Sequence, residues 1–134
     1  AFIGGVGWPV LYATAGWRPA ILVISGTGCT VFVHTGGGST FNIGGRGTLW
    51  GEDGGAYGLA CAGLRAAADA IDGLGPATAL VTALPAAAGC PSFDALVRWG
   101  GPAAKAAVAA LARPVLAAAE SGDGAARRCV EDQA

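Results

Sequence analysis

Residues 20–47 read AILVISGTGCTVFVHTGGGSTFNIGGRG, and the pattern of this stretch decides the fold. Ala20–Ile24 is a continuous aliphatic run bounded by turn residues, which predicts a strand buried on both faces. Thr30–His34 is β-branched and aromatic, and Ser39–Ile43 follows it after a glycine-rich turn. Because only short glycine loops separate the three runs, we expect them to form an antiparallel three-strand meander.

The residues after this stretch have helical character. The spacing of apolar residues and the turn residues between them predict several helices, with the first packed on a face of the meander. The expected helices are Gly54–Ile71, Pro76–Ala88, Ser92–Trp99, Pro102–Glu120 and a last one over Ala125–Gln133. The chain is therefore predicted to be a single α/β unit.

Composition excludes several classes of protein. The chain is 53% hydrophobic and 13% charged, its net charge is −1, and it has no run of like charges. Disorder, a nucleic-acid surface and a membrane span are therefore not expected. The first 17 residues have no basic segment, so we expect no signal peptide. Four widely spaced cysteines without a CxxC pair argue against a zinc site and predict a reduced, cytoplasmic protein.

The first motif is Gly26-Thr27-Gly28, which lies between two predicted strands. Glycines lack a Cβ, so such a turn can bring backbone N–H groups and a hydroxyl close to a phosphate. The alternative is a plain hairpin turn without a ligand.

The second motif is Gly44-Gly45-Arg46-Gly47, followed by Gly51-Glu52-Asp53-Gly54-Gly55 before a helix. A carboxylate in this loop can bind sugar hydroxyls beside the helix start. The alternative is that the two carboxylates simply cap the helix.

Taken in order, these motifs resemble the N-acetylglucosamine kinase and BadF/BadG/BcrA/BcrD ATPase family of the actin-like superfamily. The resemblance is specific over residues 20–72 and weaker over residues 96–134, and before residue 20 it rests on Leu11–Gly16. It implies a ribonuclease-H-like fold for residues 1–134, as part of the second such domain of a longer protein. Residues 1–19 would be a lead-in, residues 20–53 the strands and ligand loops, and residues 54–134 the helical part.

The resemblance also implies roles for single residues. Gly26, Thr27 and Gly28 would contact the phosphates of ATP, with Mg²⁺ as the accompanying ion. The amino sugar would bind at a second set of residues, namely Gly45, Arg46, Gly47 and Glu52. Asp53 takes the adjoining acidic position as a structural residue. A homodimer of the complete protein is left open.

The sequence departs from the family pattern at the catalytic base. The family's aspartate would fall near Val6–Gly7, but no acidic residue precedes Glu52. General-base catalysis is worth about 10²–10⁴ in rate, so its loss would be serious. The family's first phosphate hairpin and its adenosine-binding glycines are not found either. We therefore expect this chain to be a fragment that is inactive alone.

Three functions remain open. The first is ATP-dependent phosphorylation of N-acetylglucosamine or glucosamine by the parent protein, a role in carbohydrate metabolism. The second is a BadF-type ATPase that activates a radical dehydratase or reductase. Such activators carry an iron–sulfur cluster on paired cysteines, and no cysteine of this chain stands in a cluster motif, which favours the kinase. The third is a non-catalytic binding module, which the missing aspartate favours.

Three further residues could have either a functional or a purely structural role. His34 is expected to face solvent in a turn rather than act in catalysis. Cys29 is expected to be a small buried filler, although a thiol beside a phosphate loop could be activated. Trp50 could stack on a sugar ring because it lies inside the proposed sugar loop.

Overall fold

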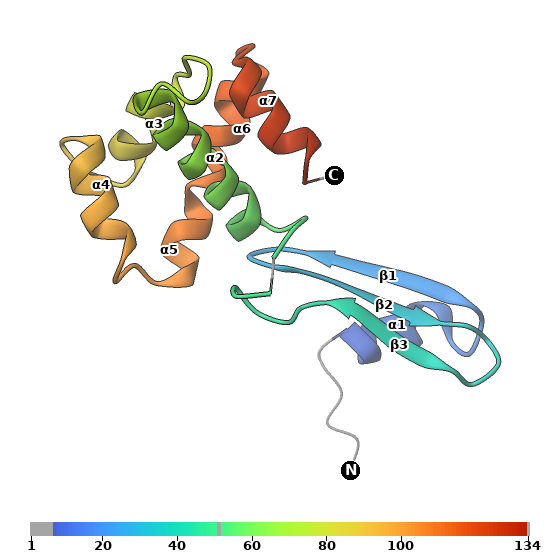
Figure 1. Cartoon of the computed structure of the whole chain (residues 1–134). Helices are drawn as coiled ribbons and strands as arrows, with labels where there is room; N and C mark the ends of the chain where they lie inside the picture. The colour runs from blue at the N-terminus through green and yellow to red at the C-terminus, as the bar shows by residue number, and fades with distance from the viewer. Residues whose placement is uncertain (1–6, 51, 134) are drawn as a thin grey trace.

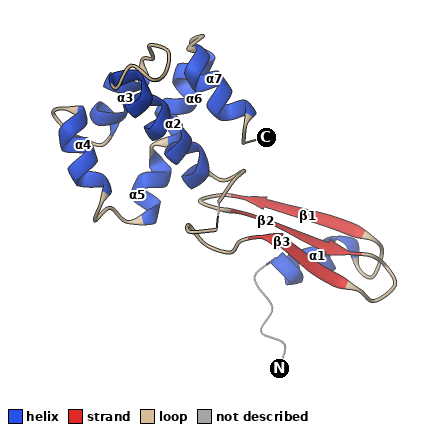
Figure 2. Ribbon diagram, viewed as in Figure 1, coloured by secondary structure: helices blue, strands red, loops and turns tan. Residues whose placement is uncertain are grey.

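The computed structural model describes residues 7–50 and 52–133, which form one small sheet and seven helices (Figure 1). Helix α1 (Gly7–Ala15) precedes the strands β1 (Ala20–Ser25), β2 (Cys29–His34) and β3 (Thr40–Gly44). The other helices are α2 (Ala56–Ile71), α3 (Leu80–Ala87), α4 (Phe93–Gly100), α5 (Lys105–Ala110), α6 (Ala112–Glu120) and α7 (Gly124–Glu131). Figure 2 shows α1 with the strands on one side of the molecule and α2–α7 gathered on the other.

The sheet is the predicted antiparallel meander. Its strand order is β1-β2-β3, and each strand begins and ends within one residue of the expected bounds. Val31 on β2 lies opposite Val23 on β1 and Ile43 on β3. Tight turns join consecutive strands, so the pairing is local in sequence and its register can be read from the pattern of residues.

Helix α1 covers one face of the sheet. Trp8 packs edge-on against Phe32 with ring centroids 5.1 Å apart, and Tyr12 lies 5.6 Å from the His34 ring. The prediction that the first helix after the strands packs on the sheet is therefore wrong. That helix, α2, packs against α3, α5, α6 and α7 instead, because its buried face consists of Leu59 and small residues that let other helices approach.

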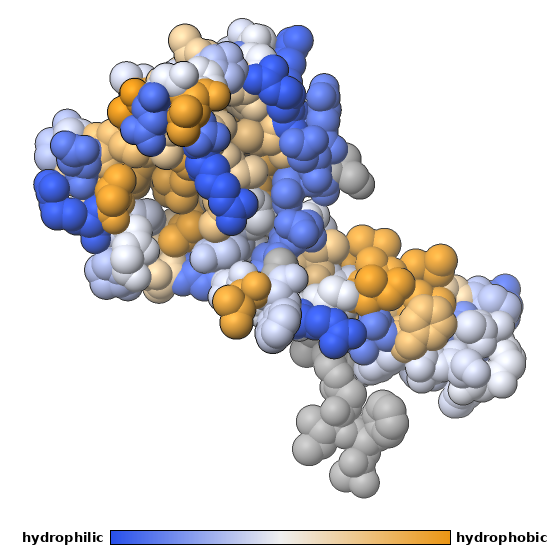
Figure 3. Space-filling model, viewed as in Figure 1, coloured by the Kyte–Doolittle hydropathy of each residue, from blue (hydrophilic) through white to orange (hydrophobic). Residues whose placement is uncertain are grey.

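No described helix covers the opposite face of the sheet. Ile21, Val23, Phe41 and Ile43 are 69%, 60%, 48% and 57% exposed there, and Val31 and Val33 lie between them. Figure 3 shows apolar side chains gathered over this part of the molecule. The prediction that β1 is buried on both faces is wrong for the described residues, since its burial alternates along the strand.

His34 is buried beneath α1 and does not face solvent. It is 2% exposed, and its Nδ1 lies 3.1 Å from the carbonyl oxygen of Arg18. Its Nε2 has no hydrogen-bond partner among the described residues. The predicted turn position was wrong because α1, which the sequence did not clearly indicate, closes over the end of β2.

The core of the molecule lies among α2–α7. The largest fully buried side chains are Leu80, Leu84, Leu96 and Val115, with alanines such as Ala60 and Ala126 between them.

The helix predicted over Pro102–Glu120 is in fact two helices, α5 and α6. Pro114 explains the break, because it lacks an N–H and its ring would clash with the carbonyl of Ala110 in a continuous helix. Within the described ranges, no helix combines the length and apolar character needed to cross a bilayer.

Candidate functional site

The turn between β1 and β2 is tight, and several of its hydrogen-bond donors have no acceptor within the described residues. The Gly26 N–H donates to the Gly28 carbonyl at 2.9 Å. Across the described residues, the N–H groups of Thr27 and Gly28 and the Thr27 hydroxyl have no acceptor, and Thr27 is exposed. Two amides and a hydroxyl on one short turn form a donor set suited to an anion such as a phosphate.

The same turn is anchored to the start of α2. The N–H groups of Ala56 and Tyr57 donate to the carbonyls of Gly26 and Thr27 at 2.8 and 2.9 Å. No side chain caps α2 at its N-cap residue, Gly55. The first amides of the helix are therefore satisfied by the turn itself, and the simple reading that Glu52 caps this helix does not describe the structure.

Glu52 lies directly behind the turn. Its side chain is 4% exposed, and its Oε1 is 2.5 Å from the Nζ of Lys105. A Cβ added to Gly28 would overlap the Glu52 carboxylate, so glycine at position 28 permits this approach. The structure thus brings together Gly28 and Glu52, which the sequence assigned to two different ligands.

Lys105 is the site residue that sequence reasoning missed. It lies at the start of α5, 53 positions after Glu52, and its side chain is 40% exposed. Its Nζ is also 5.7 Å from the centre of the Tyr57 ring. The neighbouring Cys61 thiol raises the pKa of the Tyr57 phenol. The one available signal was that Lys105 is the only lysine in the chain.

The predicted sugar loop leaves the sheet at the same end as the turn (Figure 1). Gly45 packs against the Thr30 side chain, Arg46 is exposed, and the Gly47 carbonyl accepts a hydrogen bond from the Trp50 N–H at 3.1 Å. Trp50 is 76% exposed. Glu52, in contrast, is turned away from solvent by Lys105, so the four proposed sugar residues do not form one open surface.

A mostly apolar pocket of about 350 Å³ adjoins the turn. It is bounded by residues of the turn, of α2 and of the last two helices, including Ser25, Gly26, Leu59, Leu116 and Val130. The polar groups near it already have partners. The Ser25 hydroxyl donates to the Gly54 carbonyl at 2.5 Å, and the Gly54 N–H donates to Gln133 at 3.1 Å.

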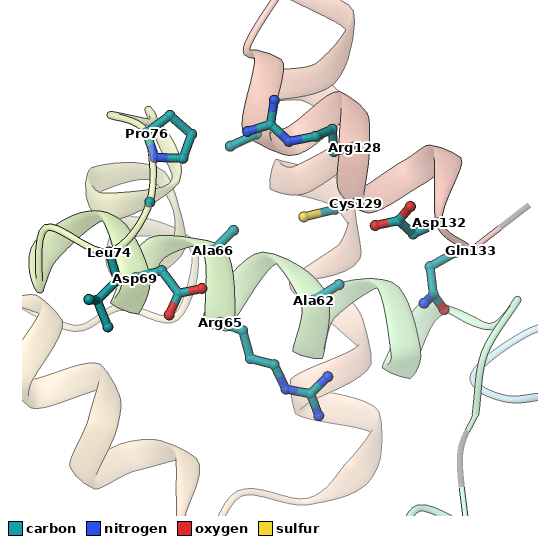
Figure 4. A pocket seen from close by; sticks show the side chains of 12 residues that line it. Ala62, Arg65, Ala66, Asp69, Leu74, Pro76, Arg128, Cys129, Asp132 and Gln133 are labelled. Carbon is teal, nitrogen blue, oxygen red and sulfur yellow. The ribbon is translucent and has the colours of Figure 1, made fainter.

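A second pocket, of about 480 Å³, lies between α2 and α7 (Figure 4). Arg65, Asp69, Arg128 and Asp132 surround a floor of small residues. Burial raises the pKa of the Cys129 thiol there, which makes it a poor nucleophile. None of the residues predicted to bind a ligand lines this pocket.

The described residues hold no cluster suited to a metal ion. No three His, Cys, Asp or Glu side chains within residues 7–50 and 52–133 lie close enough to share one. The four cysteines are all free thiols, and they lie apart in the fold: Cys29 on β2, Cys61 on α2, Cys90 in the loop between α3 and α4, and Cys129 on α7. Magnesium in phosphoryl-transfer sites is bound largely by phosphate oxygens and water, so a nucleotide would bring most of its ligands.

Of the two positions expected for a catalytic aspartate, the one that the structure describes, Gly7, has no room for a side chain. Val6 lies outside the described residues, and Gly7 opens α1. A Cβ at Gly7 would overlap the Phe32 ring, with the Phe32 Cζ at 2.5 Å. An acidic side chain at this position would therefore displace α1 from the sheet.

Comparison with known proteins gives two findings. A model of the BadF/BadG/BcrA/BcrD ATPase family matches residues 7–134. The crystal structure of a candidate N-acetylglucosamine kinase from Chromobacterium violaceum is 29% identical and aligns with a TM-score of 0.79. The match covers 92% of this chain and 42% of that one, so this chain spans less than half the length of its structural relative. No curated protein matches the sequence.

Proposed function

The chain belongs to the BadF/BadG/BcrA/BcrD ATPase family, and from this membership we propose that it supplies the phosphate and sugar loops of an ATP-dependent amino-sugar kinase. The membership confirms the resemblance predicted from the sequence, and the match starts at residue 7, earlier than expected. The fold is that of the actin-like ATPases and sugar kinases. For the complete protein we propose phosphoryl transfer from ATP to N-acetylglucosamine or glucosamine.

The free hydrogen-bond donors of the β1–β2 turn are the main support for this proposal. The amides of Thr27 and Gly28 and the Thr27 hydroxyl are free donors on a turn that α2 holds in place. Phosphoryl transfer depends on positioning and on stabilising charge, which fixed donors provide. We propose that these donors would hold the phosphates of ATP, and that Mg²⁺ bound with the nucleotide would neutralise part of the phosphate charge.

The amino sugar is proposed to bind at the loop that contains Gly45, Arg46, Gly47 and Glu52. The Arg46 guanidinium is exposed and can donate to sugar hydroxyls, and the exposed Trp50 ring can stack on the sugar. Glu52 can bind the sugar only if its carboxylate gives up its ion pair with Lys105 and turns toward the sugar hydroxyls. In the structure the Glu52 carboxylate also packs against Gly28 of the turn, a contact that a glutamine of the same size would keep.

A second candidate is a nucleotide-binding module that does not transfer phosphate. It is favoured by the packing of Gly7 against Phe32, which leaves no room for an aspartate side chain at position 7. This module would bind Mg·ATP through the same turn but would show no phosphorylated sugar in any context.

The proposal is tested by titrating Mg·ATP and sugar separately. Thr27→Ala should weaken Mg·ATP binding by roughly ten- to a hundredfold, because a hydrogen bond to a charged group contributes about 1.5–3 kcal/mol. Glu52→Gln in the complete protein should chiefly weaken sugar binding. Thr40→Ala is the matched control, since Thr40 is an exposed strand residue on β3 away from the turn.

Calorimetry gives the affinities, and the melting temperature of each variant gives the control for folding. Equal Mg·ATP affinity for the wild type and Thr27→Ala would show that the turn is only a hairpin. Mg·ATP binding without sugar phosphorylation by the complete protein would favour the second candidate.

A further inference from the structure

Lys105 is at the start of a helix, a position where a positively charged side chain is not favoured by the helix itself. It is the first residue of α5, whose N-cap residue Ala104 makes no side-chain cap and whose first turn has no acid. The free amides at a helix start carry partial positive charge, so a lysine there is electrostatically disfavoured. Lys105 also forms the one ion pair found among residues 7–50 and 52–133. The reason for a lysine at this position therefore lies in its contact with Glu52.

Glu52 connects Lys105 to the turn. Its Oε1 pairs with the Lys105 ammonium, while its Oε2 rests against Gly28. With 4% of its side chain exposed, the carboxylate has little water to solvate it. A buried carboxylate without a cation is strongly disfavoured, so Glu52 would leave this position if Lys105 were lost.

The turn has two supports, one on each side. On one side the N–H groups of Ala56 and Tyr57 hold its carbonyls, and on the other the Glu52 carboxylate packs on Gly28. Loss of the second support would let the Thr27 and Gly28 amides move. Displacements of about 1 Å at a positioned group are enough to lower activity strongly.

We propose that Lys105 is a positioning residue: it holds the Glu52 carboxylate against Gly28 and thereby fixes the phosphate-binding turn without touching the ligand. The effect on ATP binding rests on the proposed function, whereas the effect on the turn does not. Lys105 thus links α5 to a ligand loop that lies far away in the sequence.

The first test needs no ligand and uses the ¹⁵N-labelled chain. Lys105→Met should shift the amide resonances of Thr27 and Gly28 and speed hydrogen exchange of the Tyr57 amide, which donates to Thr27. We expect exchange to become about tenfold faster, in line with the loss of a hydrogen bond to a charged group. Lys105→Arg keeps the charge and should restore the wild-type resonances. Arg113→Met, which removes an exposed charge on α6, is the matched control.

The second test measures Mg·ATP binding to the same variants. Lys105→Met should raise the dissociation constant about tenfold. The double variant Lys105→Met/Glu52→Gln should bind no more weakly than Lys105→Met, because no buried charge is left without a partner. Lys105→Arg and Arg113→Met should bind as the wild type does.

Two results would overturn the inference. One is that Lys105→Met leaves the Thr27 and Gly28 resonances unchanged. The other is that Lys105→Met weakens Mg·ATP binding by the same factor in the Glu52→Gln background, which would mean direct contact with the ligand. Should the wild-type chain bind no Mg·ATP, the proposed function fails, and the resonances still decide whether Lys105 positions the turn.

Discussion

Single residues decide how closely the turn and α2 approach each other. A Cβ added to Gly55 would lie 2.6 Å from the Cα of Gly28, and one added to Gly28 would overlap Glu52. Two glycines that are distant in sequence are thus needed at the same contact. Because neither has a side chain, the start of α2 can cap the turn and Glu52 can support it.

Asp123 is a single residue whose effect on stability depends on pH. Its carboxylate accepts hydrogen bonds from the N–H groups of Ala125 and Ala126 and from Thr78 and the Ala79 N–H. Burial raises the pKa of Asp123, but these hydrogen bonds outweigh burial and the net effect lowers it. The folded state thus favours the charged form, and the resulting stability is present above about pH 4 and lost as pH falls further.

We therefore expect Asp123→Asn to lower the free energy of unfolding by about 1 kcal/mol at pH 7, a typical value for a helix N-cap. The difference from the wild type should shrink as the pH is lowered through 4 to 3. Urea titrations at several pH values measure it, with Asp53→Asn, at an exposed carboxylate, as the control. A difference that stays constant down to pH 3 would contradict the role of the charge.

Residues of the site differ in how far the sequence could predict them. Gly26, Thr27 and Gly28 stand next to one another, so their common location was certain once the strands were predicted. The contact of Glu52 with Lys105 joins residues 53 positions apart, on two segments whose relative placement depends on the packing of α2 and α5. No local pattern encodes such a contact.

At the scale of elements, α1 depends on its first residue. Gly7→Ala would place a methyl group inside the Phe32 ring, so α1 must move away from the sheet. We expect the free energy of unfolding to fall by about 1–3 kcal/mol, as for other overpacked sites. Denaturant unfolding followed by circular dichroism, together with tryptophan fluorescence for Trp8, measures both stability and docking.

Gly100→Ala is the control for this experiment. It adds the same methyl group to a helix at a point where nothing lies within 4 Å, and it should leave stability nearly unchanged. If Gly7→Ala were as stable as Gly100→Ala, the packing of α1 on Phe32 would be refuted.

Elements built from local contacts were predicted well, and those shaped by distant contacts were not. The strands β1–β3 pair with their sequence neighbours, so alternation and turn residues were sufficient. The packing of α2 away from the sheet depends on four other helices that the pattern cannot place. The break between α5 and α6 was predictable from Pro114, because a proline inside an expected helix removes a hydrogen bond.

For the whole molecule, we expect no kinase turnover from the 134-residue chain alone. Glu52, the acid that contacts the turn, is buried and paired with Lys105, and the position of Gly7 has no room for a base. A coupled assay with Mg·ATP and a panel of amino sugars checks this. Turnover at an ordinary kinase rate, about 1–100 s⁻¹, would show that the chain contains a complete catalytic site.

The uncovered face of the sheet also governs how the chain behaves when it is concentrated. Ile21, Val23, Phe41 and Ile43 offer an apolar patch, and a net charge of −1 at pH 7 provides little repulsion between chains. We therefore expect folded chains to associate with one another at high concentration. Turbidity should rise on addition of ammonium sulfate, which strengthens apolar association, and a charge introduced by Val23→Glu should delay it.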